Sequence, residues 1–303
     1  MISSLELKSM LESFDNFLFD ADGVLWLGNS PIPGAIDFLN MLVSVGKNVY
    51  LISNNSSKSL EEYVVKLKKL GFTMIQRDNI YTPAIVAADY IAKNRKNSDL
   101  PVYLIGTKGL SQSLKDAGVE SFGVGADHFN SYTKNEFLDE IPLESKVSAV
   151  LCSYDNHFSY AKMMKAANYL LDEDVLFVIT NEDKTFPGPK PGILIPGSGS
   201  ISAAVIACAP RAPLVIGKPH KHIMDYMKER VHLQSDRAIM FGDRLDTDIA
   251  FGHNNGIKTC LVQTGIHNLI DVANLSPTCP NTPNLTPHFT TLSFVELMAS
   301  SSS

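Results

Sequence analysis

The chain has 303 residues, of which 45% are hydrophobic, and carries a formal charge of −6 with a pI near 5.7. This length allows a sizeable core, with one large domain plus an insertion or a second domain. The Lys and Arg residues are scattered along the chain, so there is no basic field to hold nucleic acid. A small-molecule partner is favoured.

The N-terminal segment, residues 1–14, mixes charged residues with short apolar runs and lacks the apolar stretch of a secretory signal. No run of about 18 or more apolar residues is present to span a bilayer. The four cysteines lie far apart without metal-like spacing: Cys152, Cys208, Cys260 and Cys279. We therefore expect reduced thiols in a cytoplasmic protein that does not bind membranes.

Short β-branched and aromatic runs alternate with amphipathic segments of helical length along the chain, a pattern typical of a doubly wound parallel sheet in the α/β class. The predicted strands are 16–19, 49–53, 102–105, 149–151, 176–180, 214–216, 238–241 and 259–262. The predicted helices are 35–45, 60–70, 84–93, 160–171, 200–207 and 222–230.

The interval between Ser53 and Lys218 is far longer than one crossover, and it has its own strand and helix alternation from about residue 102 to residue 207. This predicts a discontinuous, Rossmann-like core domain, 1–95 and 213–303, with an inserted α/β domain, 96–212, whose boundaries are good to about ten residues. Within the insert, the Pro- and Gly-rich segment 186–199 is expected to be an ordered loop, because proline restricts the backbone.

Polar residues follow four of the predicted strands, at positions where a core does not need them. They are Asp20 and Asp22, then Ser53, Asn54 and Asn55, then Lys218, and finally Asp243, Asp246 and Asp248. Because the carboxyl ends of strands in a doubly wound sheet meet at one crevice, these four strand ends are expected to build a single site.

The residue types in this set suit phosphoryl chemistry. Magnesium prefers oxygen ligands, so Asp20 and Asp243 are expected to be direct ligands. Ser53 and Asn54 are suited to donate hydrogen bonds to phosphoryl oxygens, and Lys218 supplies positive charge.

The second carboxylate of the first motif is suited to proton transfer. Asp22 is expected to protonate a leaving alkoxide and later to activate water against an aspartyl-phosphate.

Each residue also has a purely structural interpretation. A single aspartate beside glycine is commonly a turn or helix cap, Ser53 to Asn55 can cap the next helix, and a lysine before proline is usually solvated. The order of the four motifs favours the functional interpretation. Of the last pair, Asp248 is assigned to the site and Asp246 is left as structural.

These four motifs, in this order, resemble those of the haloacid dehalogenase superfamily. The resemblance covers nearly the whole chain, and four runs are similar to the branch that contains phosphoglycolate phosphatases, pyridoxal phosphate phosphatases and 4-nitrophenylphosphatases. These runs are Gly23-Val24-Leu25-Trp26, Ile32-Pro33-Gly34-Ala35, Ser53-Asn54-Asn55-Ser56-Ser57-Lys58 and Gly242-Asp243-Arg244-Leu245-Asp246-Thr247-Asp248.

The resemblance implies a role for each motif residue. Asp20 would be the nucleophile and a magnesium ligand, and Asp22 the acid/base that also offers its main-chain carbonyl to the metal. Lys218 would be the stabilising cation, Asp243 a metal ligand, and Asp248 an indirect support of the metal shell. The inserted domain would be a cap that excludes water, reads the leaving group and forms a homodimer interface.

Substrate choice is expected in the cap, at Tyr154 and Phe186. The resemblance gives pyridoxal phosphate phosphatases Tyr and His at these positions and phosphoglycolate phosphatases Phe and Leu, so this chain matches neither pattern fully. The alternative that both rings only pack within the cap stays open, as does the role of His157. Ser56-Ser57-Lys58 is closer to the phosphoglycolate type.

The favoured function is a magnesium-dependent phosphomonoesterase acting on a small metabolite, such as phosphoglycolate, pyridoxal phosphate or a p-nitrophenyl phosphate-like ester. Two other classes were weighed. A nucleotide-binding module is disfavoured because no GxGxxG follows a strand. A non-catalytic dimeric scaffold is disfavoured because all four motifs are intact.

Overall fold

The computed structural model describes residues 2, 4–127, 143, 146–187, 192–275 and 285–301. The chain folds into two units, and each is described here by itself. The first unit comprises Met1–Ser53, Tyr63–Tyr81 and Lys218–Ser303, and the second comprises Asn54–Glu62 and Thr82–Gly217.

A six-stranded parallel sheet forms the centre of the first unit, with strand order β15-β14-β13-β1-β4-β5. Its strands are β1 (Asn16–Phe19), β4 (Asn48–Ile52), β5 (Ile80–Tyr81), β13 (Ala238–Gly242), β14 (Lys258–Val262) and β15 (Phe289–Thr291). A short antiparallel hairpin follows β1, made of β2 (Trp26–Leu27) and β3 (Ser30–Pro31).

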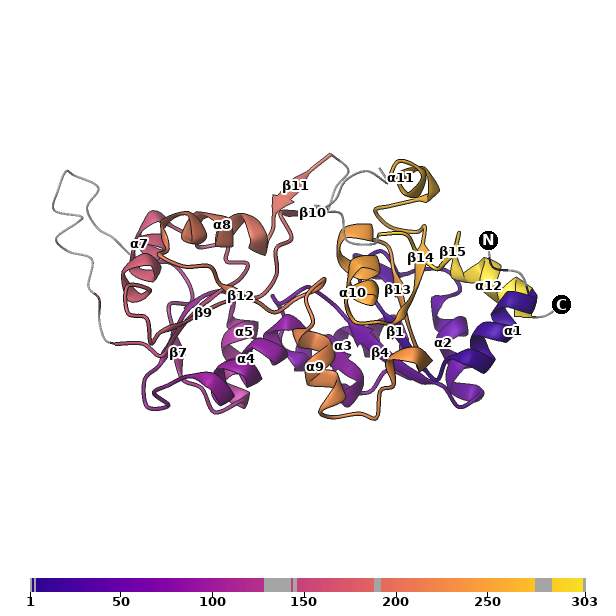
Figure 1. Ribbon diagram of the computed structural model, residues 1–303, viewed down its shortest axis with the longest axis horizontal. Coiled ribbons are helices and arrows are strands. Elements are labelled where there is room, and N and C mark those ends of the chain that lie inside the picture. The colour runs from indigo at the N-terminus through magenta and orange to yellow at the C-terminus, as the bar shows by residue number, and fades with distance from the viewer. Residues whose placement is uncertain are drawn as a thin grey trace. The chain divides into compact units, whose positions relative to one another are not determined.

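Helices cover both faces of this sheet, because its strands are apolar on both sides. Figure 1 shows α1, α2 and α12 along one face and α3, α9 and α10 along the other. The helices are α1 (Ser4–Ser13), α2 (Ala35–Ser44), α3 (Leu60–Leu70), α9 (His222–Lys228), α10 (Ala250–Asn254), α11 (Leu269–Ala273) and α12 (Phe294–Ser301). Two 3₁₀ turns (Arg77–Asn79 and Ser235–Arg237) and a π turn (Leu245–Ile249) complete the unit.

Four fully buried phenylalanines hold one helical layer on the sheet. Phe19 and Phe241 stack with ring centroids 4.9 Å apart on neighbouring strands, and Phe38 of α2 and Phe294 of α12 pack over them. Burying a side chain of this size contributes roughly 1.5–3 kcal/mol. This packing fixes the direction in which β1 and β13 end.

The chain reverses its direction across the sheet at β1. Strand β4 lies on one side of β1, whereas β13 lies on the other and leads on to β14 and β15. Such a switch point opens a crevice outside the carboxyl ends of the central strands. Asp20, Ser53 and Asp243 each follow one of these strands.

The second unit has its own five-stranded parallel sheet, with strand order β12-β9-β8-β6-β7. Its strands are β6 (Val102–Ile105), β7 (Ser121–Phe122), β8 (Ala149–Cys152), β9 (Leu176–Ile179) and β12 (Leu214–Val215). Figure 1 shows α4 (Pro83–Asn94) and α5 (Lys108–Asp116) on one face of this sheet, and α7 (Tyr160–Tyr169) and α8 (Ser198–Cys208) on the other.

The predicted fold class is confirmed, and each of the eight predicted strands has a counterpart in one of the two parallel sheets. Segment 186–199, which was expected to be an ordered loop, differs from that prediction. It contains an antiparallel pair, β10 (Thr185–Pro187) and β11 (Leu194–Pro196), and the start of α8. Residues 188–191 lie outside the described part of the chain.

The second unit includes α4 and residues 54–62, which the sequence analysis assigned to the core. The domain boundaries at residues 95 and 212 stay a prediction. Of the cysteines, Cys152 and Cys260 are buried free thiols and Cys208 is an exposed one, while Cys279 lies outside the described residues. Within the described ranges, every helix is too short or too polar to cross a bilayer.

Candidate active site

Lys218 lies at the centre of the polar cluster in the first unit, and its side chain is 1% exposed. Its Nζ donates to Asp20 Oδ1 at 2.5 Å, to Asp248 Oδ1 at 2.7 Å and to the carbonyl oxygen of Ile52 at 2.9 Å. Three segments far apart in sequence are therefore joined by one ammonium group. Such charge-assisted hydrogen bonds are about twice as strong as neutral ones.

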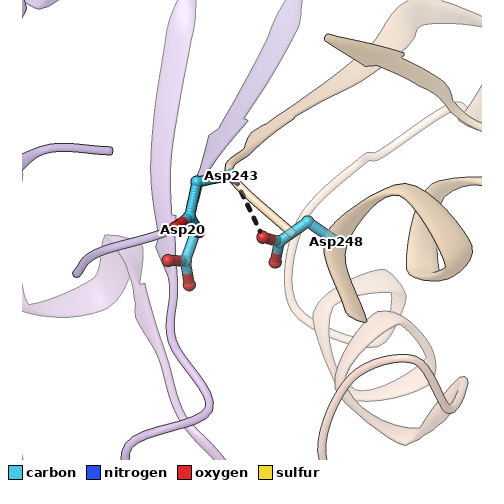
Figure 2. Close-up of side chains that lie close together, drawn as sticks. All are labelled: Asp20, Asp243 and Asp248. Carbon is cyan, nitrogen blue, oxygen red and sulfur yellow. Dashed lines mark hydrogen bonds between the residues drawn. The ribbon is translucent and has the colours of Figure 1, made fainter. Parts of the chain in front are cut away.

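Asp243 and Asp248 are oriented by backbone N–H groups. Asp248 Oδ2 accepts from the N–H of Asp243 at 3.2 Å and of Arg244 at 3.1 Å, and Figure 2 shows the first of these bonds. Asp243 Oδ2 accepts from the N–H of Ile266 at 2.8 Å. The π turn Leu245–Ile249 follows β13 and places Asp248 over the carboxyl end of that strand. Both oxygens of Asp248 are thus used within the protein.

Asp20, Asp243 and Asp248 form the one group of potential metal-binding side chains found among the described residues. One carboxylate oxygen from each lies within 4.8 Å of the others. Figure 2 shows Asp20 and Asp243 side by side at the ends of their strands, with Asp248 reaching toward them from the turn. An all-oxygen donor set suits a hard cation such as Mg²⁺.

Two glycines make room for the Asp243 carboxylate. A Cβ on Gly265 would lie 1.9 Å from Asp243 Oδ2, and a Cβ on Gly23 would lie 2.5 Å from the same atom. Gly23 also has a φ of +94°, which side-chain-bearing residues rarely adopt. Neither position accepts a larger residue without moving the carboxylate.

The electrostatics of the cluster favour a bound cation. Burial raises the pKa of Asp20 well above its ordinary value, and the charges of Asp248 and Asp243 act in the same direction against that of Lys218. Burial and the charge of Asp248 raise the pKa of Asp243 to about 7. Burial opposes the charge on Lys218, but Asp20 and Asp248 hold its pKa above the usual range. Three carboxylates facing one ammonium leave an excess of negative charge.

Asp22 lies in the same unit but not in this cluster, and its side chain is 52% exposed. Its Oδ1 accepts a hydrogen bond from the indole Nε1–H of Trp26 at 2.7 Å, and Lys66 Nζ is 3.8 Å from the same oxygen. Trp26 belongs to a motif that carries the family resemblance but had no predicted role, and Lys66 was not predicted to belong to the site.

Ser53 is buried directly after β4. Its backbone N–H donates to the carbonyl oxygen of Tyr81, and its hydroxyl oxygen accepts from the Tyr63 hydroxyl at 3.1 Å. The hydroxyl of Ser53 is therefore held in position by α3.

Asn54 and Asn55 belong to the second unit, where both are fixed by local bonds. The carbonyl oxygen of Asn54 accepts from Asn181 Nδ2 at 2.8 Å, and its side-chain Nδ2 lies 3.3 Å from Asp183 Oδ2. Asn55 Oδ1 accepts from both the N–H and the hydroxyl of Ser57. Asn55 thus forms a local turn of the kind typical of asparagine.

The rings of Tyr154 and Phe186 pack against each other in the second unit. Their centroids are 5.7 Å apart and the ring planes are inclined by 72°, an edge-to-face arrangement. Tyr154 also packs on the apolar core of this unit, and Phe186 is 40% exposed. The loop that carries Tyr154 is anchored by a buried ion pair of Asp155 with Lys162 at 2.5 Å, and the His157 side chain in it is exposed.

Asp246, left as structural by the sequence analysis, forms two hydrogen bonds with Arg244 at 2.8 and 3.1 Å. The segment after β14, where Gly265 and Ile266 contact Asp243, was not predicted from the sequence. The rule used for the other motifs, polar or small residues at a strand end, would have indicated this segment. Thr264 Oγ1 in it also donates to the carbonyl oxygen of Gly23 at 2.6 Å.

Buried carboxylates and a lysine at the switch point of a parallel sheet are typical of an α/β enzyme whose active site lies at the strand ends. Two family models match the chain: "Haloacid dehalogenase-like hydrolase" over residues 17–120 and "HAD-hyrolase-like" over residues 215–289. A 4-nitrophenylphosphatase of Schizosaccharomyces pombe is 38% identical over 266 residues, which are 87% of this chain and 88% of that protein.

Other relatives extend this result. A glycerol-3-phosphate phosphatase of Rattus norvegicus is 36% identical over 98% of this chain and 94% of its own length. A Caenorhabditis elegans protein named as a NipSnap protein is 50% identical over 84% of this chain. The matched region spans only 49% of that protein.

Solved structures of phosphatases are similar to this chain. A 4-nitrophenylphosphatase from Thermotoga maritima has a TM-score of 0.77 and 27% identity over 96% of this chain and 99% of its own. A glycerol phosphate phosphatase from Mycobacterium tuberculosis, solved in complex with magnesium, has a TM-score of 0.75 and 26% identity over 95% of this chain and 77% of its own. The chain belongs to the haloacid dehalogenase-like hydrolases, in their phosphatase branch.

Proposed function

We propose that this phosphatase is a magnesium-dependent phosphomonoesterase that hydrolyses small phosphorylated metabolites through an aspartyl-phosphate on Asp20. The observation that carries the proposal is the contact of Lys218 Nζ with both Asp20 and Asp248, beside Asp243. This cluster provides a nucleophile, a fixed positive charge and a set of oxygen ligands in one place.

Asp20 attacks phosphorus with a carboxylate oxygen, and the bond from phosphorus to the ester oxygen breaks. Asp22 gives its proton to that departing oxygen. Asp22 then takes a proton from water, whose oxygen bonds to phosphorus as the bond to Asp20 breaks. Lys218 holds Asp20 in place and balances charge on the transferring group.

Asp20 and Asp243 would hold the metal directly, together with the main-chain carbonyl of Asp22. Asp248 acts indirectly, because its two oxygens already bind Lys218 and the backbone N–H groups of Asp243 and Arg244. When bound, Mg²⁺ supplies positive charge that lets an anionic nucleophile approach an anionic ester. The excess of carboxylates over ammonium groups in the cluster supports a divalent cation.

Ser53, Asn54 and Asn55, with Lys218, are proposed to bind the phosphoryl oxygens. Tyr154 and Phe186 are proposed to contact the leaving group. Their edge-to-face packing favours a small leaving group over a flat ring inserted between them, because the two rings already touch. Phosphoglycolate and glycerol phosphate are therefore better candidates than pyridoxal phosphate. The relatives named above as glycerol phosphate phosphatases agree with this choice.

A phosphate-release assay with and without Mg²⁺ tests the proposal, using p-nitrophenyl phosphate, phosphoglycolate, glycerol 3-phosphate and pyridoxal phosphate side by side. We expect Mg²⁺-dependent turnover that Asp20→Asn abolishes. Asp37→Asn, a matched change on the exposed face of α2, should retain it. Substantial phosphate release by Asp20→Asn would exclude Asp20 as nucleophile.

Two further expectations remain proposals: a homodimer formed through residues 96–212, and a cytoplasmic location. The mass of the purified protein by light scattering tests the first. Fluorescent tagging in cells tests the second.

A further inference from the structure

Trp26 is the one tryptophan of this chain, and its side chain is fully buried. Its ring packs edge to face on Phe72, with centroids 5.9 Å apart. A phenylalanine would keep an aromatic contact with Phe72 but would be smaller and could not donate a hydrogen bond. The indole Nε1–H instead donates to Asp22 Oδ1 at 2.7 Å.

The backbone brings these two side chains together through a closed turn. The N–H of Trp26 donates to the carbonyl oxygen of Ala21 at 3.1 Å, and the N–H of Gly23 donates to the carbonyl oxygen of Trp26 at 2.8 Å. The indole is thus rigidly placed by the core on one side and by the turn on the other. Asp22, by contrast, is half exposed and has little packing of its own.

Lys66 of α3 reinforces the same contact. Its Nζ lies 4.3 Å from the centre of the Trp26 ring and 3.8 Å from Asp22 Oδ1, and its side chain is 17% exposed. A cation over an indole face is attracted by the ring, so Lys66 is held where its charge faces Asp22. Within the described part of the chain, both contacts of the Asp22 carboxylate use Oδ1.

We propose that Trp26 is a positioning residue for Asp22. An indole N–H can only donate, so it binds Oδ1 as an acceptor in either protonation state and leaves Oδ2 to carry the proton. The proton then passes from Oδ2 to the ester oxygen as the bond from phosphorus to that oxygen breaks and the bond to Asp20 forms. This inference rests on the proposed function, because it assigns Trp26 a part in the same proton transfer.

The leaving group distinguishes positioning from simple packing. An alkoxide needs a proton in order to leave, whereas p-nitrophenolate is a stable anion that leaves without one. Loss of a well-placed general acid costs about 10²–10⁴-fold where the proton is needed, and misplacement should cost part of that. The ratio kcat/KM covers the steps from substrate binding through departure of the leaving group, and it excludes the later hydrolysis of the aspartyl-phosphate.

The test compares wild type, Trp26→Phe and Phe72→Leu with glycerol 3-phosphate and with p-nitrophenyl phosphate in Mg²⁺. We expect Trp26→Phe to lower kcat/KM about tenfold or more for the alkyl ester and less than about threefold for the aryl ester. Phe72→Leu disturbs the packing of Trp26 but keeps its N–H. It should lower thermal stability and leave the ratio between the two substrates unchanged.

A second measurement does not depend on turnover. A single tryptophan gives a single indole N–H cross-peak in a ¹H–¹⁵N correlation spectrum. We expect this peak downfield and slow to exchange in the wild type, and shifted upfield with faster exchange in Asp22→Ala. An indole peak unaffected by Asp22→Ala would show that the hydrogen bond is absent and would overturn the inference.

The two proposals fail in different ways. A wild type without phosphatase activity overturns the proposed function, and with it the role of Trp26, whatever the spectrum shows. An active wild type whose substrate ratio is unchanged in Trp26→Phe overturns the positioning role alone. A ratio that falls equally in Phe72→Leu would also overturn it, because packing would then explain the effect.

Discussion

Lys218 Nζ lies 2.7 Å from Asp248 Oδ1, and both side chains are 1% exposed. When one partner of an ion pair buried to this degree loses its charge, the other charge is left unpaired and the protein is strongly destabilised. Asp248 also holds the backbone at Asp243 and Arg244. It therefore links the proposed cation of the reaction to the proposed metal ligand without needing to touch the substrate.

Asp248→Asn should lower phosphate release about 10- to 100-fold and raise the Mg²⁺ concentration needed for half-maximal rate, as is typical when a partner of a metal ligand is changed. A Mg²⁺ titration of the initial rate measures both effects. Asp246→Asn is the matched control, since Asp246 is 55% exposed and pairs with Arg244. Equal losses in the two variants would contradict the role given to Asp248.

Gly265→Ala should abolish most of the activity, because its Cβ would lie 1.9 Å from Asp243 Oδ2 and must displace that carboxylate. Gly46→Ala is the control for backbone strain. Gly46 has a φ of +79° and open space around its Cβ position, so alanine there should cost about 1–2 kcal/mol of stability without loss of turnover. Thermal unfolding and kcat, measured on both variants, separate strain from displacement. Full activity in Gly265→Ala would refute the close approach.

Asn181→Ala should raise KM more than it lowers kcat. Asn181 Nδ2 donates to the carbonyl oxygen of Asn54 at 2.8 Å, and Asn54 is proposed to bind the phosphoryl group. Losing one buried hydrogen bond to a carbonyl costs about 1–3 kcal/mol in the placement of that segment. Steady-state kinetics with p-nitrophenyl phosphate measure the effect. Asn168→Ala, which removes an exposed bond within α7, should match the wild type, and an unchanged KM in Asn181→Ala would count against this role.

Asp15 should make the free energy of unfolding depend on pH in the acid range. The hydrogen bond from Arg237 is the largest effect on Asp15, and together with the hydrogen bond from Lys47 and the charges of both cations it outweighs the opposing effect of burial and lowers the pKa to about 2. A carboxyl whose pKa is lower in the folded than in the unfolded state stabilises the fold above its unfolded pKa of 3.8. That contribution is lost as the pH falls from about 4 toward 2.

Urea unfolding of wild type and Asp15→Asn across this range checks the sign. The wild type should be the more stable protein at pH 6, and the difference should shrink as the pH approaches 2. A difference that stays constant with pH would show that the pair contributes through packing alone.

Local patterns in the sequence were enough to predict the fold class and the positions of the strands that carry Asp20 and Asp243, because apolar runs alternate with helix-length segments along the chain. The same patterns predicted the polar residues Ser53 and Lys218 at strand ends. Residue type and neighbours in the chain are enough for such assignments.

The side chains that meet in the folded protein could not be predicted from these local patterns. Trp26 and Lys66 converge on Asp22, Gly265 yields space to Asp243, and Asn181 binds the backbone of Asn54. These contacts depend on the direction of side chains and on the packing of segments up to 241 residues apart, as Thr264 and Gly23 are. The β10–β11 pair was missed because its prolines, read locally, indicate a loop, whereas pairing between two segments formed the strands.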